Sequence, residues 1–361
     1  MKPLPTPKKQ VEHALHGNIG AKVPFTIYES MIPQCAVERE LRNRGLCIVF
    51  RHNVVKSYYP NVKIRHETTF ENSRQLIRKY FETPYGTLSN LIEPAGFTVW
   101  HHEKLFKSPD DYQALRFLLQ DQVFKPDYEA FAKAEQAFGE DAIFRTTFGL
   151  EPLQDLISGE YIKMQDFCME WMVNRDEILK LYEILVEKKR SIYNIVAESP
   201  ASHANYGGNV VAEIICKETF EEYFVPHYNE AAEAMHKNGK LIGCHFDANC
   251  SLIAESINST DLDYVEAFTP APDTDMTLAE ARKAWPDKVL WINFPSSVHL
   301  EDTAKVKQIT CELLEQTGSM EGLLMGITED MPPEKWQQSC LAIMDGLENH
   351  AADHPEKYQL N

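Results

Sequence analysis

The segment that decides the fold reads GKLIGCHFD and spans residues 239–247. It is a short apolar run that ends in polar residues, as a buried strand of a parallel sheet does. Three similar runs follow, and stretches with a helical period separate them. The predicted strands are Leu241–His245, Asp263–Phe268, Val289–Phe294 and Gly322–Ile327, and helices are expected near 250–257, 277–284, 301–316 and 333–349. Four βα units in about 110 residues indicate a parallel sheet with helical crossovers.

Capping residues predict where three helices begin. Pro332 and Pro333 suit the first turn of the last helix, with Asp330 as its cap. The sequence SPDD at 108–111 combines a cap, a proline and two acidic residues, so a helix is expected to start there. Asn174 and Glu177 could form a capping-box pair that opens a helix to about residue 196.

The first half of the chain is less regular. Pro24–Tyr28 and Asp141–Phe148 read as strands, whereas residues 47–90 contain short β-like pieces and a helical stretch near 73–81, which we interpret as an insertion. No GxGxxG motif follows the first strand, and no Pro/Gly/Ser-rich linker divides the chain. Extrapolation from four units to eight predicts an α/β fold: a single (β/α)8 TIM barrel over residues 21–361, preceded by an N-terminal extension over 1–20.

Composition restricts the partners of the protein. The 361 residues include 54 Asp plus Glu against 36 Lys plus Arg, a formal charge of −18. This balance argues against nucleic acid and anionic membranes as partners, because both require a basic surface. The first ten residues lack the apolar stretch of a signal peptide, and no CxxC pair occurs among the eight cysteines. We therefore expect a cytoplasmic protein with free thiols.

Polar residues follow the predicted strands, where the catalytic groups of a (β/α)8 barrel gather. They are His245, Asp247, Glu266, Asn293 and Glu329, and Tyr206 lies on another probable strand. We take Glu266, Asn293 and Tyr206 as candidate catalytic residues. Imidazole and carboxylate groups that converge on one point could hold a divalent metal such as zinc, or could perform acid–base chemistry without one.

Each of these residues also has an ordinary structural explanation. His245 could be a hydrogen-bonded core or surface residue, Glu266 could face water at the barrel rim, and Glu329 with Asp330 could cap the last helix. Aromatic residues near the strand ends could line a pocket or belong to the core; they are Tyr28, Trp100, Phe148, Tyr206, Trp291 and Phe294. A site is favoured because four consecutive strands each bring a polar group to the same rim.

Several short segments together carry a family resemblance. They are TPYGT (83–87), FKSPDDY (106–112), FEEY (220–223), HKNGK (236–240), GCHFDAN (243–249), DYVEAFTP (263–270) and GITED (326–330). As a set they resemble the uroporphyrinogen decarboxylase superfamily over most of residues 20–350. The resemblance implies a (β/α)8 barrel with its site at the carboxyl rim.

The superfamily comprises two chemistries. True decarboxylases carry an arginine-containing segment after the first strand, because their tetrapyrrole substrate bears eight carboxylates. The corresponding residues 28–33 read YESMIP and contain no arginine, and the chain is strongly acidic. A uroporphyrinogen decarboxylase-like lyase acting on a porphyrinogen or small acid is therefore the less favoured alternative.

The resemblance favours the other branch, the corrinoid-dependent methyltransferases that use zinc. Its thiol-methylating members carry a His-x-Cys pair and a further cysteine, whereas this chain keeps His245 and has Asp247 and Glu329 at the cysteine positions. The resemblance thus implies a metal on His245, Asp247 and Glu329, a small O-methyl substrate, and a partner corrinoid (cobalamin) protein. Glu266 would be a fourth ligand or would orient the histidine. A metal- or ligand-binding barrel without turnover remains the non-enzymatic alternative.

Overall fold

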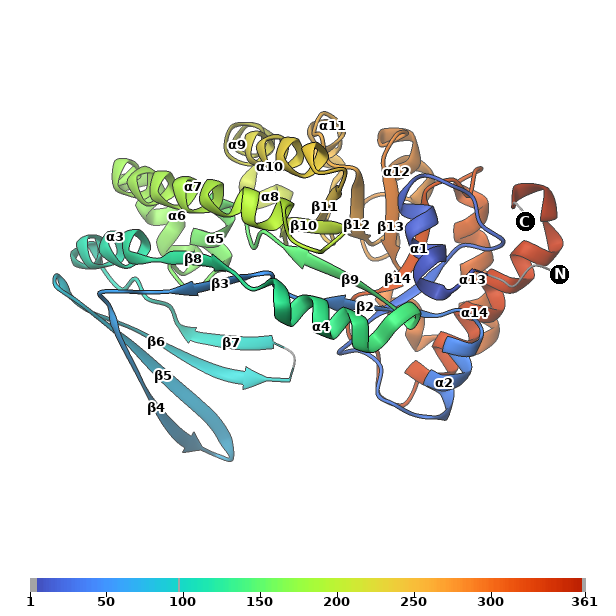
Figure 1. The fold of residues 1–361 in the computed structure, drawn as a ribbon, viewed down its shortest axis with the longest axis horizontal. Helices are drawn as coiled ribbons and strands as arrows, with labels where there is room; N and C mark the ends of the chain where they lie inside the picture. The colour runs from blue at the N-terminus through green and yellow to red at the C-terminus, as the bar shows by residue number, and fades with distance from the viewer. Residues whose placement is uncertain (1–4, 97, 359–361) are drawn as a thin grey trace. The chain divides into compact units, whose positions relative to one another are not determined.

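The computed structural model describes residues 5–96 and 98–358 of the chain. Eight parallel strands close into a barrel in the order β1-β14-β13-β12-β11-β10-β9-β2 (Figure 1). Their bounds are β1 (Phe25–Tyr28), β2 (Cys47–Arg51), β9 (Ala142–Thr147), β10 (His203–Gly208), β11 (Leu241–His245), β12 (Tyr264–Phe268), β13 (Val289–Asn293) and β14 (Leu323–Ile327). The predicted (β/α)8 barrel is confirmed, and the six strands predicted from the sequence match to within one residue at either end.

Helices lie outside the strands of the second half (Figure 1). They are α8 (Ala212–Ile215), α9 (Lys217–Tyr223), α10 (Val225–Lys237), α11 (Ala254–Asn258), α12 (Leu278–Ala284), α13 (Thr303–Gln316) and α14 (Trp336–Asp353). The predicted start of α14 was wrong, because Asp330 does not cap it and both prolines precede it. The carbonyl of Pro332 accepts hydrogen bonds from the amides of Lys335 and Trp336, so a turn separates Glu329 from the helix.

Helix α1 (Pro7–Leu15) covers the amino-terminal end of the barrel. The Thr6 hydroxyl accepts a hydrogen bond from the amide of Lys9 and caps the helix. Buried residues of α1 pack in one hydrophobic core with Trp291 inside the barrel and with Val289, the first residue of β13. The carboxyl end of the barrel, at the other end of the strands, is left for the candidate site. Two further helices flank the first strands: α2 (Ala36–Asn43) and α4 (Tyr128–Phe138).

The chain divides into two compact units. The first contains residues 5–53, 129–147 and 200–358 and holds all eight barrel strands, whereas the second contains residues 54–128 and 148–199. The segment predicted as an insertion at 47–90 therefore begins later, because Cys47–Arg51 is the barrel strand β2.

The second unit contains two antiparallel sheets. Strand β3 (Val55–Tyr58) pairs with β8 (Val123–Pro126), and a separate sheet has the order β4-β5-β6-β7. The bounds of the latter are β4 (Lys63–Glu71), β5 (Arg74–Thr83), β6 (Gly86–Ala95) and β7 (Thr98–Glu103). The helix predicted near 73–81 was wrong. These residues form β5, in which Ile77 pairs with Ile92 and Phe81 pairs with Leu88 of β6.

The helices of the second unit are α3 (Tyr112–Asp121), α5 (Pro152–Ser158), α6 (Met164–Val173) and α7 (Arg175–Ala197). The helical start at SPDD is confirmed: a 3-10 turn over Pro109–Asp111, with a capping box of Ser108 and Asp111, leads into α3. The capping box predicted for Asn174 and Glu177 was wrong. The Asn174 amide donates to Glu170 at 2.7 Å instead, and Glu177 forms ion pairs with Arg116 and Lys180.

All eight cysteines are free thiols, as the sequence predicts. Within the described residues, no helix combines the length and the apolar character needed to span a bilayer.

Candidate functional site

The structure brings His245, Asp247 and Glu329 together at the carboxyl rim of the barrel. His245 is the last residue of β11, Asp247 follows it by two, and Glu329 lies two residues beyond β14. One ligand atom from each of the three side chains lies within 4.8 Å of the others. The predicted donor set is therefore close enough to share one ion.

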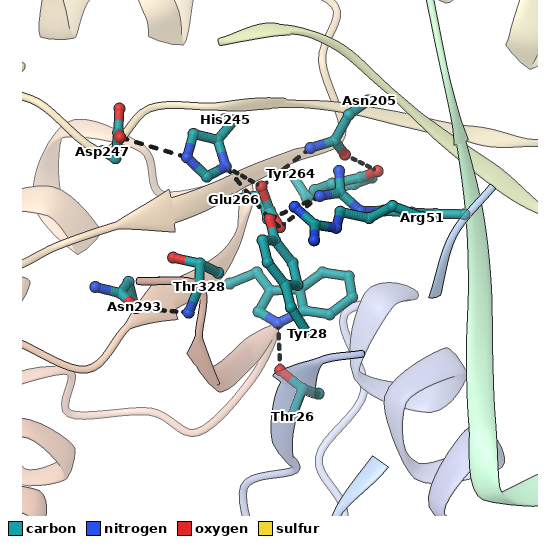
Figure 2. Close-up of polar contacts among 12 residues, drawn as sticks. Thr26, Tyr28, Arg51, Asn205, His245, Asp247, Tyr264, Glu266, Asn293 and Thr328 are labelled. Carbon is teal, nitrogen blue, oxygen red and sulfur yellow. Dashed lines mark hydrogen bonds and ion pairs between the residues drawn. The ribbon is translucent and has the colours of Figure 1, made fainter. Parts of the chain in front are cut away.

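His245 uses its two ring nitrogens in opposite directions (Figure 2). Nδ1 lies 2.7 Å from Oε2 of Glu266, and Nε2 lies 3.4 Å from Oδ2 of Asp247. A carboxylate at Nδ1 holds a proton on that nitrogen, so Nε2 is the nitrogen that could bind an ion after losing its own proton. Glu266 is thus placed to orient the imidazole through Nδ1, while Asp247 lies at Nε2 and Glu329 completes the cluster.

Glu266 is completely buried and has partners for both oxygens. Tyr28 Oη donates to Oε1, Arg145 Nη2 lies 3.0 Å from Oε1, and Asn205 Nδ2 donates to Oε2 at 3.0 Å. Burial by itself would raise the pKa of Glu266, but the charges of Arg145 and His245 outweigh it and lower this pKa to about 2. Glu266 is therefore a carboxylate at every physiological pH.

The pKa of His245 is raised, in part by the negative charge of Glu266. Burial would lower the pKa of the imidazole, but the charge of Glu266 and the hydrogen bond with Asp247 raise it to about 10. The pKa of Glu329 is also raised, because the carboxyl group is removed from water and lies near Asp247. Without an ion, the rim cluster consists of an imidazolium and closely spaced carboxyl groups.

Arg145 and Tyr28 form a layer beneath the rim; the sequence pointed to Tyr28 only as an aromatic residue near a strand end and did not reveal Arg145. Arg145 is 5% exposed, and its Nη2 donates to Tyr28 Oη at 2.7 Å as well as pairing with Glu266. The guanidinium of Arg51 lies over the Tyr28 ring, 4.1 Å from its centroid, and also pairs with Glu29 at 3.2 Å. Tyr28 is held between two cations, so its hydroxyl has a fixed direction.

Backbone distortions place the side chains of the rim. The register of β12 against β13 shifts between Glu266 and Phe268, and the intervening Ala267 has φ 61° while being fully buried. A left-handed alanine in a strand costs free energy, and such strain is often found at functional sites. On β10, a Cβ added to Gly208 would lie 3.1 Å from the Cβ of His245, so the glycine leaves room for the histidine.

The structure places the other two predicted catalytic residues differently. Asn293 is buried, and its Oδ1 accepts from the amide of Thr328 at 2.9 Å, so it positions the segment that carries Glu329. Tyr206 is buried with its ring against Tyr228 of α10, with 5.8 Å between centroids. Neighbouring residues of a strand face opposite sides, so Asn205, which contacts Glu266, takes the inward position and Tyr206 points to the helices.

The sequence contained one indication of the buried ion pair beneath the rim, namely a charged residue inside a largely apolar predicted strand. Arg145 interrupts the run Ala142–Thr147, and a buried arginine needs a buried anion. The sequence did not identify that anion as Glu266, because β9 and β12 are far apart in the chain.

Comparison with known proteins supports the fold. No protein-family model matches this sequence, and the search of curated proteins finds no match. Among solved structures, a methyltransferase from Methanosarcina mazei is similar with a TM-score of 0.57 and 12% identity, over 96% of this chain and 99% of that one. The IolI protein with a bound zinc atom gives a TM-score of only 0.34 at 11% identity, over 65% of this chain and 84% of that one. At this identity the likeness to the methyltransferase extends to the fold alone, and the strand order of this chain identifies that fold as a (β/α)8 barrel.

Proposed function

We propose that the protein is a methyltransferase that moves a methyl group between a small O-methyl compound and a separate corrinoid protein. The observation that carries the proposal is the cluster of His245, Asp247 and Glu329 at the carboxyl rim, with His245 oriented by the buried Glu266. The barrel shared with a methyltransferase is compatible with this function.

The donor set fits zinc. Zinc accepts imidazole nitrogen and carboxylate oxygen, and three protein ligands leave a position for substrate. When bound, the ion would act as a Lewis acid that polarises the ether oxygen of the substrate. A set without thiolates suits an oxygen-bound methyl group better than a thiol.

Residues of the chain itself prepare this site. Glu266 keeps a proton on Nδ1 of His245, so that Nε2 faces Asp247. Arg145 keeps Glu266 ionised. Asn293 holds the backbone at Thr328 and so restrains the position of Glu329. Preorganisation of this kind lowers the cost of assembling a ligand set.

The decarboxylase alternative is less compatible with these contacts. A polycarboxylate substrate needs available cations, whereas Arg145 pairs with Glu266 and Arg51 pairs with Glu29. These two arginines are thus partly neutralised by the chain's own carboxylates.

Two measurements test the proposal. The metal content of the purified protein is compared with that of His245→Ala and of His236→Ala, a matched control in which an exposed histidine paired with Asp263 is removed. The zinc-loaded protein is then mixed with cob(I)alamin and a series of aryl methyl ethers, and methylcobalamin is followed by its absorption. We expect zinc loss and no methyl transfer in His245→Ala alone. Zinc at equal levels in all three proteins would refute the metal site; zinc without methyl transfer from any ether would leave a binding barrel.

A further inference from the structure

A second cluster of metal-ligating side chains lies on the last two helices of the barrel unit, outside the site described above. His350 and His354 are four residues apart on and just after α14, and Glu315 is near the end of α13. One ligand atom from each of the three lies within 4.8 Å of the others. A spacing of four residues places two imidazoles on the same face of a helix, as in known zinc-binding helices.

A close approach of the two helices brings the cluster together. A Cβ added to Gly346 of α14 would lie 2.7 Å from the Cβ of Thr310 on α13, so only glycine permits this separation. Cys311 Sγ lies 3.6 Å from the carbonyl oxygen of Gly346. Consecutive helices of the barrel run parallel, and one turn further along both of them are Glu315 and His350.

The two imidazoles point to the same carboxylate oxygen. Oε1 of Glu315 lies 2.9 Å from Nε2 of His350 and 3.1 Å from Nε2 of His354. The other oxygen of Glu315 is engaged by Lys357 Nζ at 2.8 Å. Three ligand atoms therefore lie close enough to share one ion, and the lysine holds the carboxylate by its other oxygen.

His350 has the orientation that a metal ligand requires. It is 2% exposed, and its Nδ1 lies 2.6 Å from the Tyr358 hydroxyl. If an ion bound to Nε2, it would replace the proton that Nε2 shares with Glu315, and the imidazole would keep its proton on Nδ1, where the Tyr358 hydroxyl can accept it. The side chains of Glu315 and His354 are 48% and 39% exposed, so an ion can enter from solvent.

We propose that Glu315, His350 and His354 form a second divalent-metal site, with zinc as its preferred ion and water completing a tetrahedral shell. Two neutral imidazoles and one carboxylate are a donor set that zinc accepts. The ion would link α13 to the end of α14 and to the 3-10 turn Pro355–Lys357 that carries Tyr358. Its role is to stabilise the C-terminal part of the barrel unit, independently of the proposed methyl transfer.

The number of zinc ions per chain tests this proposal. Wild type, His354→Ala and the control His236→Ala are loaded with zinc ions, dialysed and measured by elemental analysis, with circular dichroism to verify folding. The difference between wild type and His354→Ala counts this site alone, whatever the rim cluster binds. We expect His354→Ala to lose one equivalent and His236→Ala to lose none. Equal zinc in wild type and His354→Ala would overturn the proposal.

Two further variants test the geometry without removing a histidine. Glu315→Gln keeps the shape of the side chain but removes the charge, so zinc affinity in competition with a chromophoric chelator should fall at least about tenfold. Lys357→Met removes a cation next to the site, so affinity should rise by up to about fivefold. Zinc should also raise the melting temperature of wild type more than that of His354→Ala. An unchanged affinity in Glu315→Gln would contradict the assignment of Glu315 as a ligand.

Discussion

The replacement Glu266→Gln tests the central interaction of the candidate site. Glu266 is fully buried, lies 3.0 Å from Arg145 Nη2 and 2.7 Å from His245 Nδ1, and accepts from Asn205 and Tyr28. Glutamine has nearly the same shape but no charge, and one of its two oxygen positions becomes an NH2 group. If the NH2 group takes the position of Oε1, it faces Arg145; if it takes the position of Oε2, it faces His245 and Asn205. In either orientation at least one hydrogen bond is replaced by a contact between two donors.

The expected loss of unfolding free energy in Glu266→Gln follows from the burial of Arg145. Removing one member of a buried ion pair leaves the other charge without compensation, which costs about 3–5 kcal/mol of unfolding free energy. Arg145 is 5% exposed and cannot recover this energy from water. In addition, the imidazole of His245 loses the carboxylate that orients it, and the loss of such a partner lowers metal affinity by about 10–100-fold.

The assay combines urea denaturation of the metal-free protein with a zinc titration, and Glu329→Gln is the comparison. Glu329 is a proposed ligand but pairs with no buried arginine in the described structure, so its replacement should reduce zinc affinity without destabilising the metal-free protein. If Glu266→Gln unfolds within about 0.5 kcal/mol of wild type and binds zinc equally well, the buried network described above does not operate.

Three further predictions concern the rim cluster. Burial and the charge of Asp247 raise the pKa of Glu329, so its ionised form is disfavoured in the folded metal-free protein. Glu329→Gln should therefore be slightly more stable to urea than wild type near pH 7 in EDTA, and lower stability would contradict this. The pKa of His245 is raised from 6.5 to about 10, so the protonated imidazole contributes fully to the free energy of unfolding below pH 6.5, and this contribution is lost as the pH rises towards 10. Urea denaturation of the metal-free protein at a series of pH values should show this decline in wild type and not in His245→Asn. Zinc binding to His354→Ala should release about one proton from His245 at pH 7.5, measured by calorimetry in buffers of different ionisation enthalpy; release of none would contradict the raised pKa.

The barrel was predictable because its strands are local signals. The predicted strands are short, mostly apolar segments, and most of their residues are buried. The strand β5 was not predictable in this way. Its pairs Leu76/Tyr80 and Ile77/Phe81 repeat every four residues, which favours a helix, but pairing with β4 and β6 over its whole length overrides that period.

The rim cluster was predictable for a different reason. Parallel strands of a closed barrel end at the same face, so His245, Asp247 and Glu329 had to converge once the strands were placed. Alternation within one strand decided which side chain faces inward. The sequence placed Tyr206 in the site, whereas the strand turns Asn205 inward and Tyr206 toward α10.

The layer beneath the rim depends on contacts across the barrel that no local pattern contains. An orienting role of Glu266 for His245 requires that Glu266 remain ionised in a buried position, and Arg145 on β9 is the largest of the charges that keep it ionised. Arg145 in turn is directed by Tyr28 of β1. The three residues come from strands that are distant in sequence, so the hydrogen-bond and ion-pair partners of each one lie outside its own segment. The charge of the rim histidine is therefore set by Glu266 on the neighbouring strand β12, and the charge of Glu266 depends on Arg145 of β9 and Tyr28 of β1. These contacts join separate segments of the chain, so the pattern within one segment predicts the ligands but not the residues that support them.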